Sequence, residues 1–200
     1  MTLLNPQPRT ELATHRIDNQ AAPLADVNLY AADRLLTAMV RAAGGAPHDA
    51  HLHAFGARVG SEEAQEWGEL ANRNPPQLRA FDRYGQRLDE VEFHPAYHAL
   101  MSLGLNAGTS SIAWTAPEGG HVAHSALLYL MTQADAGVGC PMSMTYAAVP
   151  ALRHDADLLH TWLPRITAAT YDARCLPAAD KRGCTLGMAM TEKQGGSDVR

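Results

Sequence analysis

The spacing of apolar residues predicts helices over most of the chain. From Leu29 to Ala43, apolar side chains recur every three or four residues, as they do on one face of a helix. Asn28 is placed to cap this helix, and Gly44-Gly45 to end it. The same period predicts further helices over residues 48–59, 61–73, 95–105, 121–136, 145–153 and 155–163. We therefore expect a mainly α-helical protein.

Several segments break the helical period. Around residues 78–93, Val91 and Phe93 alternate with Glu90 and Glu92, which predicts a short hairpin. Cys140 to Thr145 is predicted to be a structured turn, and residues 184–191 alternate large and small side chains as a strand does. Because one strand cannot bury itself, the sequence looks cut at a domain boundary. Residues 1–28 show little periodicity and are predicted to be an arm, either exposed or bound to a partner.

Composition narrows the class of protein. The 200 residues are 46% hydrophobic and 18% charged, which is typical of a globular chain. The net charge of −5 argues against general nucleic-acid binding, although a local basic patch could still bind. No apolar run is long enough to span a membrane, and the N-terminus lacks the features of a signal peptide. The three cysteines, Cys140, Cys175 and Cys184, favour a reducing compartment such as the cytoplasm over a disulfide framework.

Four groups of residues invite a chemical role, and for each a structural explanation is favoured. The candidate metal ligands are His48, His51, His53, His121 and His124, without a cysteine or carboxylate at ligand spacing. The candidate nucleophiles are Ser143 and Cys140, which have no identifiable partner base. The candidate phosphate-binding residues are Arg73, Arg79, Arg83 and Arg87, which alternate with acids as on a solvated face. Met142 and Met144 could flank a flavin or substrate cavity, but core packing is favoured.

The predicted strand at 184–191 leads into a glycine-rich turn. Gly195 and Gly196 allow the backbone to approach a ligand closely, and exposed N–H groups in such a turn can hold an anion. The Ser197 hydroxyl could add a contact to a phosphate. The spacing alone favours an ordinary strand-to-turn connection.

The sequence M-T-E-K-Q-G-G-S-D over residues 190–198 resembles the T-E-x-x-x-G-S-D signature of the acyl-CoA dehydrogenase flavoprotein family. The residues K-Q-G-G between T-E and S-D resemble, more narrowly, the AidB-like branch of that family, which belongs to the adaptive response to alkylation. Other stretches agree in the same order, namely Asn28-Leu29-Tyr30, residues 70–76, residues 93–98 and residues 140–145. The resemblance covers nearly the whole chain after the first twenty or so residues.

The resemblance implies a fold and a cofactor. The chain would comprise an arm (1–28), a helical N-terminal domain with a hairpin excursion (29–180), and the first strand of the middle β-domain with the flavin-binding turn (181–200). The cofactor would be FAD. Its isoalloxazine edge would meet Thr191, with backbone around Met188 and Met190 beside it. Its pyrophosphate would meet Ser197, with Gly195 and Gly196 permitting that approach.

The resemblance also leaves the function open between three classes. In the family, the enzymes remove an α-proton from an acyl-CoA and pass a hydride to flavin, and the subunits form a homotetramer. Lys193 departs from the proline common at this position, and the catalytic carboxylate of the family lies in a C-terminal bundle, so no base is assigned here. The second class is a flavin-stabilised protein that protects double-stranded DNA through a C-terminal surface. The third is an isolated helical interaction domain.

Overall fold

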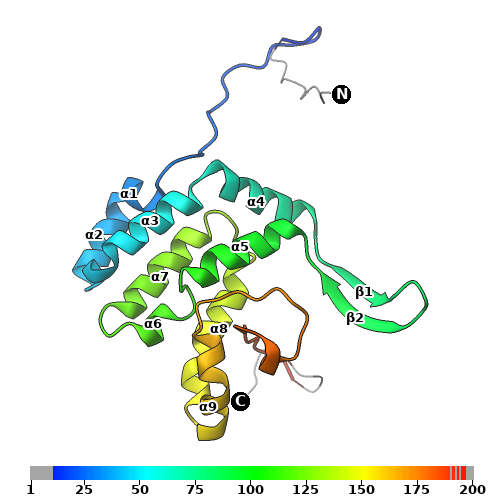
Figure 1. Ribbon diagram of the computed structural model, residues 1–200. Helices are drawn as coiled ribbons and strands as arrows, with labels where there is room; N and C mark the ends of the chain where they lie inside the picture. Colours follow the sequence, from blue (N-terminus) through cyan, green and yellow to red (C-terminus); the bar gives the residue numbers. More distant parts are fainter. Residues whose placement is uncertain (1–10, 190, 192, 194, 197–200) are drawn as a thin grey trace.

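The computed structural model describes residues 11–189, 191, 193, 195 and 196. Over these residues the protein is mainly helical, with one two-stranded sheet (Figure 1). The α-helices are α1 (Leu29–Ala32), α2 (Arg34–Ala42), α3 (Asp49–Val59), α4 (Glu62–Arg73), α5 (Pro95–Asn106), α6 (Ile112–Thr115), α7 (Gly120–Met131), α8 (Gly139–Leu152) and α9 (Ala156–Ile166). Two 3-10 helices, η1 (Ala46–His48) and η2 (Ala178–Asp180), and two strands, β1 (Gln77–Phe81) and β2 (Arg87–Glu92), complete the set.

Helix α7 lies at the centre of the helical body. It packs against α2, α3, α5, α6 and α8, while α4 covers α5 and α9 lies along α8 (Figure 1). The α7 side chains Leu127, Leu130 and Met131 are fully buried, as apolar side chains at helical spacing should be. The core around them comprises Leu29, Tyr30, Val40, Leu52, Phe55, Val59, Leu100, Met101, Leu105, Ala126, Val138 and Met142.

The first predicted helix is two helices, because Asp33 interrupts it. The Asn28 cap is confirmed, since its side-chain oxygen accepts the N–H groups of Tyr30 and Ala31 at 3.1 and 3.0 Å. Asp33 then leaves the helical conformation, and its carboxylate accepts the N–H of Leu36 at 2.8 Å as the N-cap of α2. The prediction of one continuous helix was wrong because a capping aspartate competes with the helix interior.

The turn predicted at Cys140–Thr145 is also wrong, because these residues belong to α8. Pro141 stands in the first turn of α8, where the N–H that proline lacks would have no partner in the helix. The preceding helix, α7, ends at Met131 rather than at residue 136. Gly139 is the first residue of α8.

The chain beyond α8 departs from prediction at two points. Helix α9 continues past Pro164 to Ile166, although we expected Pro164 to end it. The strand predicted at 184–191 is not formed by the described residues 184–189 and 191. Among the described residues, β1 and β2 pair with each other and offer this segment no strand to pair with.

The predicted hairpin is confirmed as β1 and β2, between α4 and α5. The strands pair antiparallel, with Leu78 opposite Val91 and Arg79 opposite Glu90. The hairpin extends away from the helical body (Figure 1). The described arm, residues 11–27, also leaves the body as an extended chain.

Candidate functional site

The approach to the glycine-rich turn is the segment of residues 181–196, which we call the C-terminal segment. The N–H of Cys184 donates to the carbonyl oxygen of Arg165 in α9 at 3.1 Å. The N–H of Leu186 donates to Oγ1 of Thr145 in α8 at 3.0 Å, and this hydroxyl donates to the carbonyl oxygen of Pro141 at 2.6 Å. Helices α8 and α9 therefore fix the first part of the segment.

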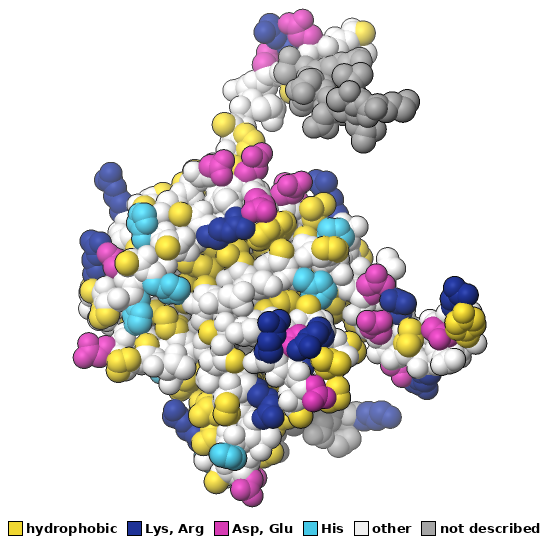
Figure 2. Space-filling view, viewed as in Figure 1, with side chains coloured by type: hydrophobic (Ala, Val, Ile, Leu, Met, Phe, Trp, Pro, Cys, Tyr) yellow, Lys and Arg dark blue, Asp and Glu magenta, His cyan; other side chains and the backbone are white. Residues whose placement is uncertain are grey.

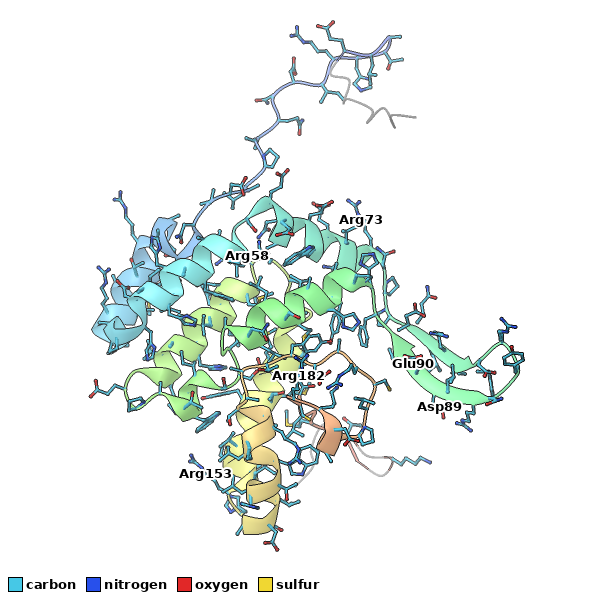
Figure 3. The ribbon with its side chains drawn as sticks, viewed as in Figure 1. Arg58, Arg73, Asp89, Glu90, Arg153 and Arg182 are labelled. Atoms are coloured by element: carbon cyan, nitrogen blue, oxygen red, sulfur yellow. The ribbon has the colours of Figure 1, made fainter. Side chains whose placement is uncertain are left out.

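A buried aspartate organises the loop that precedes this segment. The Asp172 side chain is 1% exposed, and its carboxylate accepts Nε and Nη2 of Arg174 at 2.8 and 2.6 Å. It also accepts the backbone N–H of Arg182 at 3.0 Å, next to the start of the segment (Figure 3). The hydrogen bonds from Arg174 hold the pKa of the Asp172 carboxyl far below its usual range. Asp172 is therefore an ionised structural anchor.

Gly183 completes this anchoring by close packing. A Cβ atom at Gly183 would overlap the carbonyl oxygen of Thr170, so only glycine fits without a shift. The two ends of the loop, Thr170 and Gly183, are thus in contact before the segment turns toward α8. None of these contacts follows from local sequence, although the Asp172-Ala173-Arg174 spacing signals a turn.

The described residues of the predicted flavin site lie at or near the surface. Met188 is 63% exposed, and Thr191 is exposed as well. A Cβ atom at Gly196 would lie 3.6 Å from Cγ2 of Thr191, so the turn brings these two residues together. A Cβ atom at Gly195 would meet nothing within 4 Å. Met190 and Ser197, the remaining predicted contacts, lie outside the described residues.

A tyrosine–histidine pair that the sequence did not reveal joins the same loop to α5. The Tyr171 hydroxyl lies 2.7 Å from Nδ1 of His98, and the two rings stack. Burial raises the pKa of Tyr171 to about 12 and lowers the pKa of His98, so burial favours the uncharged form of both groups. The N–H of Tyr171 donates to Oδ1 of Asn106 at 3.0 Å, which ties the loop to the end of α5.

The candidate histidines serve structural contacts. His48 and His51 each place Nε2 2.8 Å from a backbone carbonyl oxygen, of Glu118 and Ala107 respectively. His124 is buried against the ring of Tyr146, and its Nδ1 lies 2.6 Å from the carbonyl oxygen of Thr109. Within the described ranges, no three His, Cys, Asp or Glu residues are grouped as metal ligands would be.

The candidate arginines form a solvated surface, as the sequence predicts. Arg73 pairs with Glu69 at 2.9 Å, and Arg87 pairs with Asp89 at 2.6 Å (Figure 3). Arg79 lies 3.4 Å from Glu90. Basic and acidic side chains are accordingly interspersed along the hairpin (Figure 2).

The remaining candidates also have structural roles. Met142 is fully buried in the core, where it lies against Gly104 of α5, which confirms the packing interpretation for this residue. Cys140 and Ser143 lie in α8, Cys140 as an exposed free thiol and Ser143 half-buried.

An apolar groove lies between α2 and α7. Its volume is about 590 Å³, and Leu35 and Met39 on its rim are 70% and 61% exposed. Tyr129 donates from its hydroxyl to the Asp33 carboxylate at 3.1 Å along this groove. All its lining residues come from α2, α7 and their flanks, so it is separate from the C-terminal segment.

The arrangement of helices defines the class of protein. The fold is of the acyl-CoA dehydrogenase type, as two solved structures show. The apo form of Bd2924 superposes with a TM-score of 0.76 at 26% identity, over 90% of this chain and 36% of that one. The crystal structure of Caenorhabditis elegans ACDH-11 in complex with C11-CoA has a TM-score of 0.70 at 23% identity, over 96% of this chain and 33% of that one.

Sequence comparison then gives the family. A family model described as the adaptive response protein AidB N-terminal domain matches residues 19–173, and the chain belongs to this family. AidB of Escherichia coli (strain K12), whose name classes it with the acyl-CoA dehydrogenases, is 41% identical over 189 residues, which are 93% of this chain and 35% of that protein. Acyl-CoA dehydrogenase family member 11 of C. elegans is 31% identical over 75% of this chain and 24% of that protein. The chain thus spans about a third or less of the length of these relatives. The resemblance of the chain to the AidB-like branch of the acyl-CoA dehydrogenase family is confirmed.

Proposed function

We propose that this chain is the N-terminal part of an FAD-containing, acyl-CoA dehydrogenase-like protein of the AidB-like branch. Membership of the AidB N-terminal family carries the proposal, because acyl-CoA dehydrogenases are flavoproteins in general. In this proposal residues 1–28 are an arm, 29–180 the helical domain, and 181–200 the start of the middle β-domain.

The C-terminal segment supplies one edge of the flavin site. Thr191 is exposed and available to the isoalloxazine edge, and Met188, whose backbone would lie beside that edge, is exposed as well. The open space at Gly195 leaves the backbone accessible to a phosphate, which Ser197 would also contact. These properties fit FAD. When bound, FAD supplies the hydride acceptor, while the chain contributes position and electrostatics.

The substrate class follows from the relatives. The C. elegans structure contains C11-CoA, which supports an acyl-CoA for the whole protein. The family resemblance implies that the catalytic carboxylate lies in the C-terminal bundle, so we assign the base to sequence outside this chain.

A second function is favoured by the family description, which names an adaptive response protein. In this alternative the whole protein protects double-stranded DNA and turns over little substrate. Of the four candidate arginines, Arg73, Arg79 and Arg87 are paired with acids, so we assign the DNA contacts to the C-terminal part of the longer protein. The three free cysteines fit a cytoplasmic protein, and the described helices include none long and apolar enough to cross a membrane.

A chimera tests the flavin proposal. Residues 1–200 replace the matching segment of E. coli AidB, and FAD dissociation is measured by flavin fluorescence. Ser197→Ala should raise the dissociation constant roughly 5- to 30-fold, the scale of a lost hydrogen bond to a charged group. Thr191→Val should raise it roughly 2- to 10-fold. Gly187→Ala is the matched control, because a Cβ there meets nothing within 4 Å. Unchanged affinity in both site variants would remove these residues from the site.

A further inference from the structure

A small cavity lies at the base of the hairpin, where the end of α4, the start of α5 and the loop between α7 and α8 meet (Figure 1). Its volume is about 210 Å³, and its wall includes Asp135, Tyr97 and Phe93. A second cavity of about 220 Å³ shares Asn74, Phe93 and His94 with the first. The two cavities therefore adjoin, and together they offer room for a small organic group.

Asp135, in the wall of the first cavity, is a buried carboxylate whose partners are uncharged. The residue is 8% exposed, and its two oxygens accept the side-chain N–H of Asn72 and the backbone N–H of Val138, each at 3.1 Å. None of the ion pairs among the described residues includes it. Burying a charge is costly, and buried charges in proteins are as a rule paired. Asp172, which is also buried, pairs with Arg174, whereas Asp135 lacks such a cation.

The walls of the two cavities add no positive charge. Among the described residues that line them, none is a lysine or an arginine. Nδ1 of His94 accepts the backbone N–H of Ala96 at 3.2 Å, so this nitrogen carries no proton and the imidazole is uncharged. Burial raises the pKa of Tyr97, and the negative charge of Asp135 raises it further. The cavity at Asp135 is therefore electronegative.

A glycine keeps space free beside the carboxylate. Gly137 lines the same cavity, and a Cβ atom there would lie 3.2 Å from Oδ2 and 3.5 Å from Oδ1 of Asp135. Each carboxylate oxygen has two acceptor positions, and one on each is occupied by the N–H groups described above. One position on each oxygen remains, and a pair of such positions matches the two parallel N–H donors of a guanidinium group.

The rest of the wall narrows the class of cation. Within the described ranges, no three His, Cys, Asp or Glu residues are grouped as ligands of a metal ion would be. Phe93 and Tyr97 instead line the cavity with aromatic rings, which stack with their centroids 4.1 Å apart. A guanidinium group is planar, weakly hydrated and able to stack on aromatic rings, whereas an ammonium group is compact and strongly hydrated. The wall thus favours a guanidinium group.

We propose that this cavity, which we call the Asp135 cavity, binds a guanidinium group through the Asp135 carboxylate and the aromatic wall. A free guanidino compound and an arginine side chain from the rest of the longer protein present the same chemistry, and the experiment below separates these two sources. The lining of the Asp135 cavity includes no residue of the C-terminal segment, so the proposal is independent of the flavin site.

Titration of the 200-residue chain with n-butylguanidine tests the proposal. The NMR signals of the Val138 N–H and of the Asn72 side-chain amide should shift, because both groups donate to the carboxylate that binds the cation. We expect a dissociation constant on the order of 0.1–1 mM, as for a small ligand held by one ion pair and an aromatic contact. n-Butylamine has the same stem with an ammonium head, and it should bind at least about fivefold more weakly.

Two variants test the site in different ways. Asp135→Asn removes the charge and should weaken binding at least roughly tenfold. Gly137→Ala keeps the carboxylate but fills the space beside it, and should weaken binding roughly three- to tenfold. The matched control is Asp33→Asn, because Asp33 also accepts a backbone N–H and lines another cavity, the α2–α7 groove. This control should leave binding unchanged, and circular dichroism verifies that each variant keeps its helices.

The chimera with E. coli AidB separates the two sources, by saturation-transfer NMR of n-butylguanidine. Binding as strong as that of the 200-residue chain identifies a free compound as the ligand, and loss of binding in the folded chimera identifies an arginine of the longer protein. Absence of saturable binding to the 200-residue chain up to about 20 mM overturns the proposal. Binding that Asp33→Asn abolishes and Asp135→Asn does not overturns it as well, and equal affinity for n-butylamine overturns the guanidinium assignment.

Discussion

The bond between α8 and the C-terminal segment predicts a measurable difference between two threonines. Thr145 and Thr167 both donate to the carbonyl oxygen four residues earlier, at 2.6 and 2.7 Å. Thr145 alone also accepts the N–H of Leu186, at 3.0 Å. Replacing either residue with valine preserves its shape and removes the hydroxyl. The hydrogen bond from a threonine hydroxyl to the carbonyl oxygen four residues earlier contributes little to stability. The difference in the free energy of unfolding between the two variants therefore reports the hydrogen bond to Leu186.

We expect Thr145→Val to lower the free energy of unfolding by about 1–2 kcal/mol, and Thr167→Val by less than about 0.5 kcal/mol. The larger loss combines one net hydrogen bond with the cost of a half-buried N–H left unpaired. Urea unfolding measures both values. Amide hydrogen exchange should show protection of Leu186 falling roughly 5- to 30-fold in Thr145→Val alone. Equal losses in the two variants, with Leu186 protection unchanged, would refute the anchoring of the segment to α8.

Three further predictions concern pH, packing and DNA. Burial lowers the pKa of His124, so the unfolded chain binds the proton more readily and stability falls as pH drops from about 7 to about 5. His124→Asn should reduce the dependence of the thermal unfolding temperature on pH, and His154→Asn, at an exposed histidine, is the control. An equal dependence on pH in the two variants would exclude His124 as a cause. Gly183→Ala should cost about 1–3 kcal/mol in urea unfolding through its clash with Thr170, and Gly187→Ala should be near neutral; a neutral Gly183→Ala would contradict the close packing. Residues 1–200 should bind duplex DNA no better than about 10⁻⁴ M at physiological salt; micromolar binding with a log–log salt slope steeper than about −4 would reveal a basic surface.

Local signals predicted most of the secondary structure. The cap at Asn28 follows from a side chain that accepts hydrogen bonds from its own backbone, and the hairpin follows from alternating apolar and charged residues. The errors arose where one residue type has two uses. Asp33 can sit within a helix or cap a new one, and Pro141 can end a helix or occupy its first turn.

The contacts that position the candidate site were not predictable in this way. Thr145 meets Leu186 across 41 positions, and His98 meets Tyr171 across 73. Neither pair has a periodicity or a spacing that links its members. The flavin contacts of the glycine-rich turn stay a prediction from a compact motif, whereas the anchor at Asp172 depends on a loop closing on itself. The structure therefore adds the contacts that hold the approach to the predicted site.

The stoichiometry of FAD in the chimera with E. coli AidB tests the central claim most directly. The purified chimera should contain one FAD per chain by visible flavin absorbance, because residues 1–200 then complete the site. The 200-residue chain alone should retain none, since it supplies one edge of that site. A folded chimera without FAD, or a stoichiometric FAD complex of the 200-residue chain, would contradict the role assigned to the C-terminal segment.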